Sequence, residues 1–380
     1  MALRALARVN LAAIERNVVS LRARLDGGAA LCAVVKADAS GHGAVPVARA
    51  ALAGGARTLA VATAGEAHEL RAAGIAAPVL VMGAISLEEL PVALGANAAV
   101  VAWTEQFVRA VAHAAPPEAQ VNVHVKLDSG MGRLGTRDVE EAFAVAHAVH
   151  RAQPAMRLAG VMTHLATADG DLDFAAAQLA VFAPFAAELQ QRFGRLCVHA
   201  ANSAATLRVP DSHFDMVRCG IALYGCDPMN EDPDATGLEQ AMELSSYVAA
   251  VKRAEAGDSV GYGRRFIAQR PTWVATMPIG YADGVRRGLT NNCDVLIEGR
   301  RYPLIGTVSM DNITADVGPA HPGEPAVRPG AQAILIGRSG QERQTVEDIA
   351  QRLGTINHEV LCGISARVPR RYHHDGTPVP

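Results

Sequence analysis

The stretch "ALCAVVKADASGHG", residues 30–43, joins a short apolar run to a lysine, an aspartate and a Gly-His-Gly turn. An apolar run of this length between turn residues is typical of a strand that is buried on both faces, as strands of parallel sheets are. Lys36 therefore stands near the end of a buried strand, where its amine is either solvated or held for a reaction. The residues at the ends of the other strands decide between these two interpretations.

Seven further apolar runs follow before about residue 225, and Ala-rich helical patterns separate most of them. Eight alternating units predict a (β/α)8 TIM-type barrel, although a doubly wound open sheet has similar local patterns. The positions of the polar residues favour the barrel, because they gather at the carboxyl ends of strands, where barrels carry their chemistry. These residues are Lys36, Arg133, His164, Asn202, Ser203 and Arg218.

The pattern changes after about residue 235, where strand-like segments alternate with Gly and Asp turns. Only one brief helix is predicted there, near residues 345–354. The sequence thus predicts an α/β protein with an N-terminal barrel over residues 1–235 and a C-terminal mostly-β domain over residues 236–380. Residues 1–25 contain arginines throughout and lack a clean apolar core, so they indicate a helix rather than an export signal.

The composition indicates a globular protein whose partners are small molecules. Half of the residues are hydrophobic and the formal net charge is -3, which favours a sizeable core and gives no reason to expect a nucleic-acid partner. The six cysteines lack C-x-x-C spacing, so we expect no zinc ribbon or other metal site, no disulfide scaffold, and a reducing, cytoplasmic location. No segment has about 18 uninterrupted apolar residues, so we expect no membrane partner.

Three features together predict pyridoxal 5'-phosphate as the cofactor. Lys36 at the barrel mouth has an amine that could form a Schiff base with a carbonyl. Ser203 and the backbone amides of Gly220 and Ile221 follow the last two strands, where barrels often bind phosphate. Arg218 ends the eighth strand and could donate a hydrogen bond to the pyridine nitrogen without giving up a proton, which would suppress transamination. Taken singly, these features are also those of a solvated lysine, a turn and a salt-bridged arginine.

Three more side chains are candidates for contact with substrate or cofactor. Arg133 follows the fifth strand on a Gly-rich turn, where its planar fork could hold a carboxylate or the cofactor's phenolic oxygen, with Lys126 and Asp128 as its supports. His164 ends the sixth strand and either stacks on a ring or is a hydrogen-bonded structural histidine. Tyr262, between two glycines, is either a turn tyrosine or a base, and a base would need positive charge nearby.

Ordered motifs along nearly the whole chain resemble those of the bacterial alanine racemase family, the fold-type III pyridoxal phosphate enzymes. They include "AVVKADASGHG", "VKLDSGMGRLG", "ANSAAT", "RCGIALYG", "VGYGRRF" and "GTVSMDN". The resemblance implies an amino-acid racemase that interconverts L-alanine and D-alanine with two bases. Lys36 would bind the cofactor and act as one base. Tyr262, supplied by the other subunit, would act on the opposite face, which implies a homodimer with shared active sites.

The same resemblance implies roles for the remaining site residues. It implies that Arg218 contacts the pyridine nitrogen and that His164 packs against the cofactor ring, and it matches Lys126 to a lysine that is carbamylated in some members. The other matches are Ser203, Gly220 and Ile221 for the phosphate, Arg133 for the phenolic oxygen and the substrate carboxylate, Met310 for the carboxylate through its backbone amide, and Tyr281 for the substrate access path.

Four positions depart from the family pattern. Asp38 and Ser40 stand where the "KANAYGHG" pattern has an asparagine and a phosphate-holding tyrosine, His358 where a tyrosine is usual at the inner pocket, and Thr307 where an arginine is usual at the access path. We retain Ser40 and His358 as cofactor-binding candidates. A pocket that lacks bulk discriminates weakly, by about 1–3 kcal/mol per methylene. The substitutions therefore predict either broader specificity, for serine or a longer polar amino acid, or a refilled pocket that still prefers alanine.

Two rival functions fit parts of this pattern. A fold-type III decarboxylase of basic amino acids also joins a barrel to a β domain, but its glycine-rich phosphate loop and C-domain cysteine motif are not evident here. A cofactor-handling barrel without enzymatic activity is opposed by the β domain and by Tyr262.

Overall fold

The computed structural model describes residues 3–116, 120–320 and 324–379. The chain divides into two compact units. Ile14–Leu223 form the barrel unit, and Tyr224–Pro380 together with the first 13 residues form the β unit. This division differs from the predicted boundary between residues 235 and 236, because the N-terminal strand belongs to the β unit and the chain leaves the barrel unit at Leu223.

The barrel unit is built on eight strands, and every pairing between neighbours in this sheet is parallel. The order is β8-β7-β6-β5-β4-β3-β2-β9, so nearly every strand pairs with the strands that precede and follow it in the chain. The strands are β2 (Ala30–Val34), β3 (Thr58–Val61), β4 (Val79–Val81), β5 (Ala99–Ala102), β6 (Val121–Lys126), β7 (Met156–Met162), β8 (Cys197–His199) and β9 (Met216–Cys219).

The two ends of this sheet are joined by backbone hydrogen bonds. The Asp215 N–H donates to the Val198 carbonyl and the Arg218 N–H donates to the Ala201 carbonyl, each at 3.0 Å. Sequential strand order with joined ends is the order of a barrel, whereas a doubly wound sheet reverses its order at a switch point. The predicted (β/α)8 barrel is therefore confirmed.

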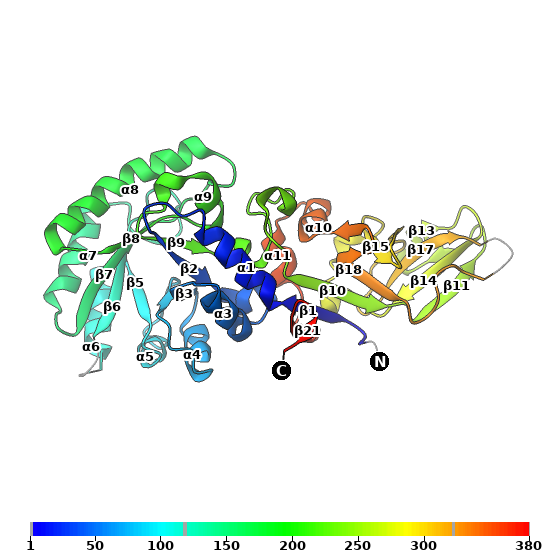
Figure 1. Ribbon diagram of the computed structural model, residues 1–380, viewed down its shortest axis with the longest axis horizontal. Coiled ribbons are helices and arrows are strands. Elements are labelled where there is room, and N and C mark those ends of the chain that lie inside the picture. Colours follow the sequence, from blue (N-terminus) through cyan, green and yellow to red (C-terminus); the bar gives the residue numbers. More distant parts are fainter. Residues whose placement is uncertain (1–2, 117–119, 321–323, 380) are drawn as a thin grey trace. The chain divides into compact units, whose positions relative to one another are not determined.

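Helices surround the strands, as the left part of Figure 1 shows. Each of the larger ones after β3, β5, β6 and β7 begins at a Thr or Asp whose side chain accepts a backbone N–H of the first turn, so short polar residues set these starts. The helices are α1 (Leu11–Arg22), α3 (Ala44–Ala53), α4 (Ala64–Ala72), α5 (Leu90–Gly95), α6 (Glu105–Ala114), α7 (Val139–Arg151) and α8 (Leu172–Phe193), with the short segments α2 (Lys36–Gly41) and α9 (Ser203–Arg208).

Helix α8 is, among the described residues, the one helix that length and composition would allow to cross a membrane. Its buried Phe182, Phe185 and Leu189 belong to the same hydrophobic cluster as Val125 of β6 and Val161 of β7. The apolar face of α8 thus helps to form the barrel core, which accounts for its hydropathy.

The described residues of the β unit form three sheets. The largest has the order β16-β15-β18-β10-β1-β20-β21, with β19 paired to β18. A second has the order β11-β14-β17, and β12 and β13 form a hairpin. The strands are β1 (Leu6–Asn10), β10 (Met242–Tyr247), β11 (Ala250–Ala254), β12 (Ser259–Val260), β13 (Phe266–Ile267), β14 (Thr272–Met277), β15 (Asp294–Ile297), β16 (Arg300–Pro303), β17 (Ile313–Pro319), β18 (Gln332–Ser339), β19 (Glu342–Gln344), β20 (Arg370–His374) and β21 (Thr377–Pro378).

The predicted mostly-β domain is confirmed, and so is its brief helix, which is α10 (Val346–Leu353). Thr345 caps this helix in a capping box with Asp348. A second helix, α11 (Asn357–Cys362), follows it directly.

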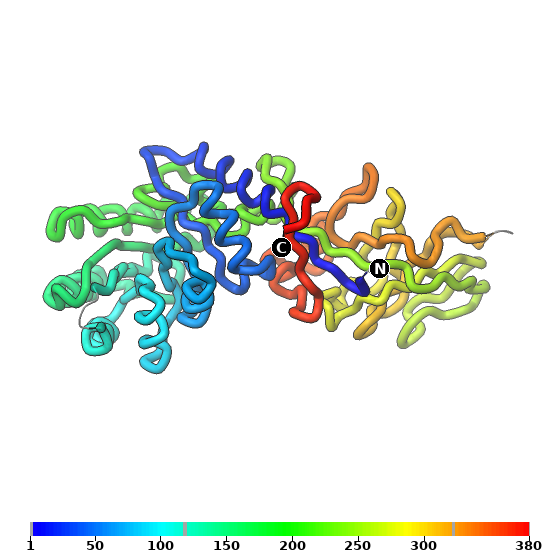
Figure 2. The backbone as a smooth tube through the Cα atoms, turned by 60° about the horizontal axis from the view of Figure 1, so that its bottom comes forward, coloured from blue at the N-terminus to red at the C-terminus, as the bar shows by residue number. Residues whose placement is uncertain are grey.

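The first strand shows that the predicted helix over residues 1–25 was wrong at its beginning. Leu6–Asn10 form β1, and the helix begins only at Leu11. Strand β1 pairs antiparallel with β10 and parallel with β20, so the blue N-terminal segment runs beside the red C-terminal one in Figure 2. Ala7 and Val9 are fully buried and the residues around them are not, a period of two that the arginines obscured in the sequence.

Candidate active site

The turn that carries Lys36 has an unusual backbone. Lys36 lies two residues after the end of β2 and is exposed within its unit. Residues 37–40 all have a φ of 52°, with ψ between 41° and 51°. These are left-handed helical values, which disfavour a non-glycine residue by roughly 1–2 kcal/mol. The segment is thus a strained turn, held by the contacts around it.

Glu66, in the first turn of α4, holds the beginning of the Lys36 turn. Its Oε1 accepts the backbone N–H of Ala37 at 2.6 Å, and its Oε2 accepts the N–H groups of Ala62 and Thr63 at 2.8 and 3.1 Å. One carboxylate thereby joins the residue after Lys36 to the end of β3 and the start of α4. No local sequence pattern indicates this contact, because it spans 29 positions.

Asp38 and His42 hold the remainder of the turn. Asp38 Oδ1 accepts the N–H of Ala44, the first residue of α3, at 2.6 Å. His42 Nδ1 lies 3.0 Å from the Ala39 carbonyl and 3.2 Å from that of Ser40, and since a carbonyl only accepts, this nitrogen is the donor. Asp38, one of the four departures from the family pattern, thus supports the turn. Ser40 is half-buried within it.

Arg218 is 3% exposed and lies near the end of β9. Its Nη2 donates to the carbonyls of Thr163 and Ala200 at 2.9 and 3.0 Å, and its Nη1 donates to His199 Nδ1 at 2.9 Å. The same Nη2 lies 3.3 Å from Nδ1 of His164. Burial lowers the pKa of Arg218 to about 10, so it stays charged at neutral pH. A fixed positive charge therefore lies at the barrel mouth among neutral acceptors.

Two buried histidines continue the hydrogen bonds of Arg218. An arginine has only donors, so His199 must accept at Nδ1 and donate from Nε2 to Nδ1 of His124, 2.8 Å away. Burial, followed by the charge of Arg218, lowers the pKa of His124 to about 4 and that of His199 well below its usual value. Both histidines are thus neutral. These two histidines were not identified from the sequence as part of the site, although each stands inside an otherwise apolar strand, which was the available signal.

The positively charged groups at the barrel mouth act on one another. Lys126 is 4% exposed, and burial together with the charges of Arg218 and Arg133 lowers its pKa to about 8. Burial also lowers the pKa of His164 well below its usual value, and the charges of Arg218, Arg133, Lys126 and Lys36 act in the same direction. The structure thus brings these five side chains into one electrostatic neighbourhood. Within the described ranges, no group of three or more His, Cys, Asp and Glu side chains is arranged to hold a metal ion.

Ser203 and the segment after β9 form a small cradle. Ser203 begins α9, which Asn202 caps, and its Oγ accepts the N–H groups of Gly220 and Ala222 at 2.9 and 3.4 Å. Ile221 lies between these two residues. The hydroxyl hydrogen of Ser203 is not used in these bonds, so it can still be donated to an anion.

The turn that carries Arg133 is supported by Asp128. This carboxylate accepts the N–H groups of Gly130 and Gly132 at 3.1 and 2.9 Å and lies 3.3 Å from Nε of Arg137. Burial alone would raise the pKa of Asp128, but these donors outweigh burial and lower it. Asp128 therefore supports Arg133 through the backbone of the turn, and the Arg133 side chain is exposed within its unit.

The β unit holds the other predicted site residues. Tyr262 lies between β12 and β13 and is 75% exposed. The Tyr281 N–H donates to the Ser309 carbonyl, and the next N–H donates to the Met310 carbonyl, each at 3.0 Å. Tyr281 and Met310 are thus neighbours, and they are 42% and 52% exposed. His358 is the second residue of α11 and is exposed within this unit.

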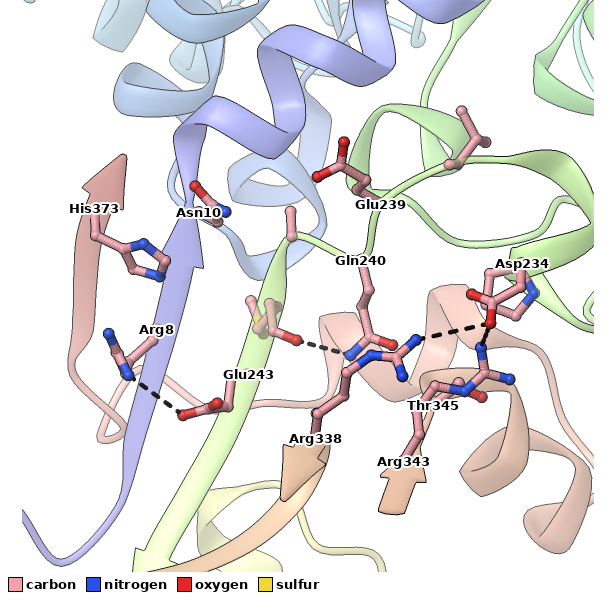
Figure 3. Close-up of a pocket in the computed structure, with 15 residues that line it drawn as sticks. Arg8, Asn10, Asp234, Glu239, Gln240, Glu243, Arg338, Arg343, Thr345 and His373 are labelled. Carbon is pink, nitrogen blue, oxygen red and sulfur yellow. Dashed lines mark hydrogen bonds and ion pairs between the residues drawn. The ribbon is translucent and has the colours of Figure 1, made fainter. Parts of the chain in front are cut away.

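The β unit also contains a cavity of about 400 Å³, which Figure 3 shows, and none of the predicted site residues lines it. Arg8 lies 3.9 Å from Glu243, and Arg338 lies 3.7 Å from Asp234, which also pairs with Arg343. These charges compensate one another within the cavity wall. Three arginines (Arg8, Arg338 and Arg343) and three carboxylates (Asp234, Glu239 and Glu243) line this cavity, so its formal charges balance, whereas lysine and arginine predominate at the barrel mouth.

The fold and the site define a class of protein: a (β/α)8 barrel whose mouth is lined by lysine and arginine, joined in one chain to a separate β unit. Residues 9–228 match the family model "Alanine racemase, N-terminal domain", and residues 241–372 match "Alanine racemase, C-terminal domain". The chain therefore belongs to the alanine racemase family.

Individual relatives agree with this assignment over nearly the full chain. The chain is 38% identical over 371 residues to Alanine racemase 2 of Caldanaerobacter subterraneus subsp. tengcongensis, covering 97% of this chain and 94% of the relative. It is 40% identical over 367 residues to the alanine racemase of Geobacillus stearothermophilus, covering 96% and 92%. Among solved structures, the Bacillus anthracis alanine racemase with bound L-Ala-P has a TM-score of 0.90 at 36% identity, covering 100% of this chain and 97% of that one. The decarboxylase and carrier alternatives gain no support from these matches.

Proposed function

We propose that this protein is a pyridoxal 5'-phosphate-dependent racemase that interconverts L-alanine and D-alanine. The observation that carries the proposal is the barrel mouth, where Lys36, Lys126, Arg133 and Arg218 all act on His164. Clustered cations of this kind suit an anionic cofactor and a substrate carboxylate. The relatives named as alanine racemases support alanine as the substrate.

The residues at the barrel mouth fit this cofactor, which carries an anionic phosphate, a phenolic oxygen and a pyridine nitrogen. Lys36 would bind it covalently through Nζ. The hydroxyl of Ser203 and the amides of Gly220 and Ile221 would hold the phosphate, with Ser40 and His358 as further candidate contacts. The fixed guanidinium of Arg218 would donate to the pyridine nitrogen. When bound, the cofactor withdraws electrons from the Cα atom of an attached amino acid, so that its proton can be removed.

Lys36 and Tyr262 would act as the two bases, on opposite faces of the substrate. One base removes the Cα proton while the conjugate acid of the other returns a proton from the opposite side, which inverts the configuration. Arg133 and the backbone amide of Met310 would hold the substrate carboxylate, and His164 would pack against the cofactor ring. Tyr281 would line the access path. Fixing the carboxylate orients Cα between the two bases.

We also propose a homodimer in which Tyr262 serves the active site of the partner. Support comes from Tyr262, Tyr281 and Met310, whose large side chains are exposed in the single chain. Tyr281 and Met310 are neighbours, and large apolar groups gathered on a surface usually mark an interface. The six cysteines all lie within the described residues and form no disulfide, which supports a reducing, cytoplasmic location.

The test is Cα-deuterium incorporation, followed by NMR in heavy water, with the holoenzyme and a panel of L-amino acids. We expect alanine to exchange with inversion faster than any other amino acid, with serine next. Faster inversion of serine or of a longer polar amino acid would reject alanine as the preferred substrate and assign the change to Ser40, His358 and Thr307. Release of carbon dioxide without inversion would reject racemisation.

A further inference from the structure

The position of the Tyr262 side chain depends on its backbone. The side chain is 75% exposed, so packing within its own chain does not hold it. The turn between β12 and β13 has positive φ values at Gly261 (75°), Gly263 (69°) and Arg264 (50°). A turn of this kind has several accessible arrangements, and one of them must be selected if the phenol is to act on a particular atom.

Two side chains join this turn to the segment at residues 306–307. The Thr307 hydroxyl donates to the Tyr262 carbonyl at 2.6 Å. Asn291 Nδ2 donates to the Arg265 carbonyl at 3.1 Å, and its Oδ1 accepts the Gly306 N–H at 2.6 Å. The bond from Thr307 is the one that reaches the residue carrying the phenol.

The two segments are in close contact. A Cβ added at Gly261 would lie 3.0 Å from the backbone nitrogen of Thr307, and one added at Gly306 would lie 2.6 Å from the carbonyl oxygen of Val260. Thr307 is only 5% exposed, so its hydroxyl is enclosed at this contact. A mostly buried hydroxyl has little access to water, so removing its bond to the Tyr262 carbonyl would not be compensated by solvent.

We infer that Thr307 is a positioning residue that fixes the Tyr262 turn for proton transfer. The inference rests on the proposed role of Tyr262 as a base. It gives a function to a position at which this chain departs from the family pattern: the Thr307 hydroxyl bonds to the backbone that carries the base, so its contribution is to the orientation of Tyr262.

The test compares Thr307→Val, which keeps the shape and removes the hydroxyl, with Thr307→Ser, which keeps the hydroxyl. For the holoenzyme, we would measure exchange of the Cα proton with solvent deuterium separately for L- and D-alanine at early times, before inversion mixes them. Each base exchanges the proton on its own face. We expect Thr307→Val to slow exchange on the Tyr262 face about tenfold, to leave the Lys36 face within about twofold, and Thr307→Ser to restore the rate.

A second measurement reports the turn itself. Amide hydrogen exchange over residues 261–265 should become about tenfold faster in Thr307→Val and stay near the native rate in Thr307→Ser, because one hydrogen bond of the turn has been removed. Unchanged amide exchange and unchanged Cα exchange in Thr307→Val would overturn the inference, as would equal slowing on both faces that serine does not restore. If Tyr262→Phe itself leaves exchange intact on both faces, the proposed base is wrong instead.

Discussion

The turns that carry Lys36 and Tyr262 present their side chains in different ways. In the Lys36 turn, residues 37–40 are all non-glycine and all have a φ of 52°. In the Tyr262 turn, glycines at positions 261 and 263 take two of the three positive φ values. Glycine adopts such values with no steric penalty, whereas alanine, aspartate and serine do not.

This difference explains the number of supports around each turn. The Lys36 turn is held by Glu66, by Asp38 and by His42, whose bonds offset a conformation that is unfavourable by itself. The relaxed Tyr262 turn is held by Thr307 and Asn291. A strained turn provides rigidity at the cost of stability, and a glycine turn provides mobility that a few hydrogen bonds must limit.

The largest effect should follow from Lys36→Ala. We expect a loss of racemase activity of at least about 1000-fold and the loss of the visible absorption band of bound cofactor, because the amine that binds it is gone. The control is Lys252→Ala, an exposed lysine on β11, which should keep both. A Lys36→Ala protein that kept the band would assign the cofactor to the buried Lys126 and break the comparison.

Tyr262→Phe should keep the absorption band and slow racemisation by about 100- to 10,000-fold. Because L- and D-alanine have equal free energies, kcat/KM must fall equally in the two directions. The distinguishing observation is exchange of the Cα proton without inversion, which should persist for the one enantiomer whose proton faces Lys36. Continued inversion, or loss of exchange for both enantiomers, would contradict separate roles for the two turns. Tyr302→Phe, on β16, is the matched control.

In Glu66→Ala, cofactor-free protein should regain its absorption band about tenfold more slowly, because the Lys36 turn loses the carboxylate that accepts the Ala37 N–H. It should also lower the free energy of unfolding by about 1–2 kcal/mol, since the α4 cap is weakened. Thr63→Ala is the control, because it removes the capping oxygen that accepts the Glu66 N–H but leaves the bond to Ala37. Equal effects of both variants on the rate would show that Glu66 acts only as a cap.

The last comparison concerns charge burial, which distinguishes the barrel mouth from the exposed Tyr262 turn. The pKa of Lys126 is about 8 in the folded protein and about 10.4 unfolded. Below pH 8 the folded protein therefore holds a buried charge that destabilises it, and the penalty disappears as pH rises through 8 toward 10.4. Lys126→Met should stabilise the protein by up to about 3 kcal/mol at pH 7 and by little at pH 10.5, as measured by urea unfolding.

Lys252→Met, at an exposed position, should show no such pH dependence. If Lys126→Met instead destabilised the protein at pH 7, the charge at this position would be the negative one of a carbamylated lysine held by Arg133, and the barrel mouth would be less positive than its side chains suggest.

The architecture could be predicted from the sequence because it depends on short-range patterns. Buried parallel strands appear as continuous apolar runs, and the order of β and α segments restricts the sheet to few topologies. Lys36, Arg133, His164 and Arg218 were recognisable because each follows or ends such a run, at the face where barrel strands present polar groups.

The supports of the site could not be predicted, because they depend on contacts between distant positions. Nothing in "ADAS" indicates a left-handed turn, since these residues favour other conformations and the bonds of Glu66, Asp38 and His42 hold this one. The bonds from Arg218 through His199 to His124 join three different strands. Likewise, 45 positions separate Thr307 from Tyr262. Strand β1 was missed because a five-residue alternation next to a helix is too short to detect.

The position of β1 in the sheet also means that the barrel unit can be completed earlier during synthesis than the β unit. The barrel unit is one continuous stretch, and its last strand exists once Cys219 has been made. Strand β1 is made first, but one of its two partners, β20, ends at His374. Because chains fold progressively as they emerge, the barrel can form before β20 has been made and has paired with β1. A chain that stops before residue 370 leaves one edge of β1 open, and an open strand edge is a template for aggregation.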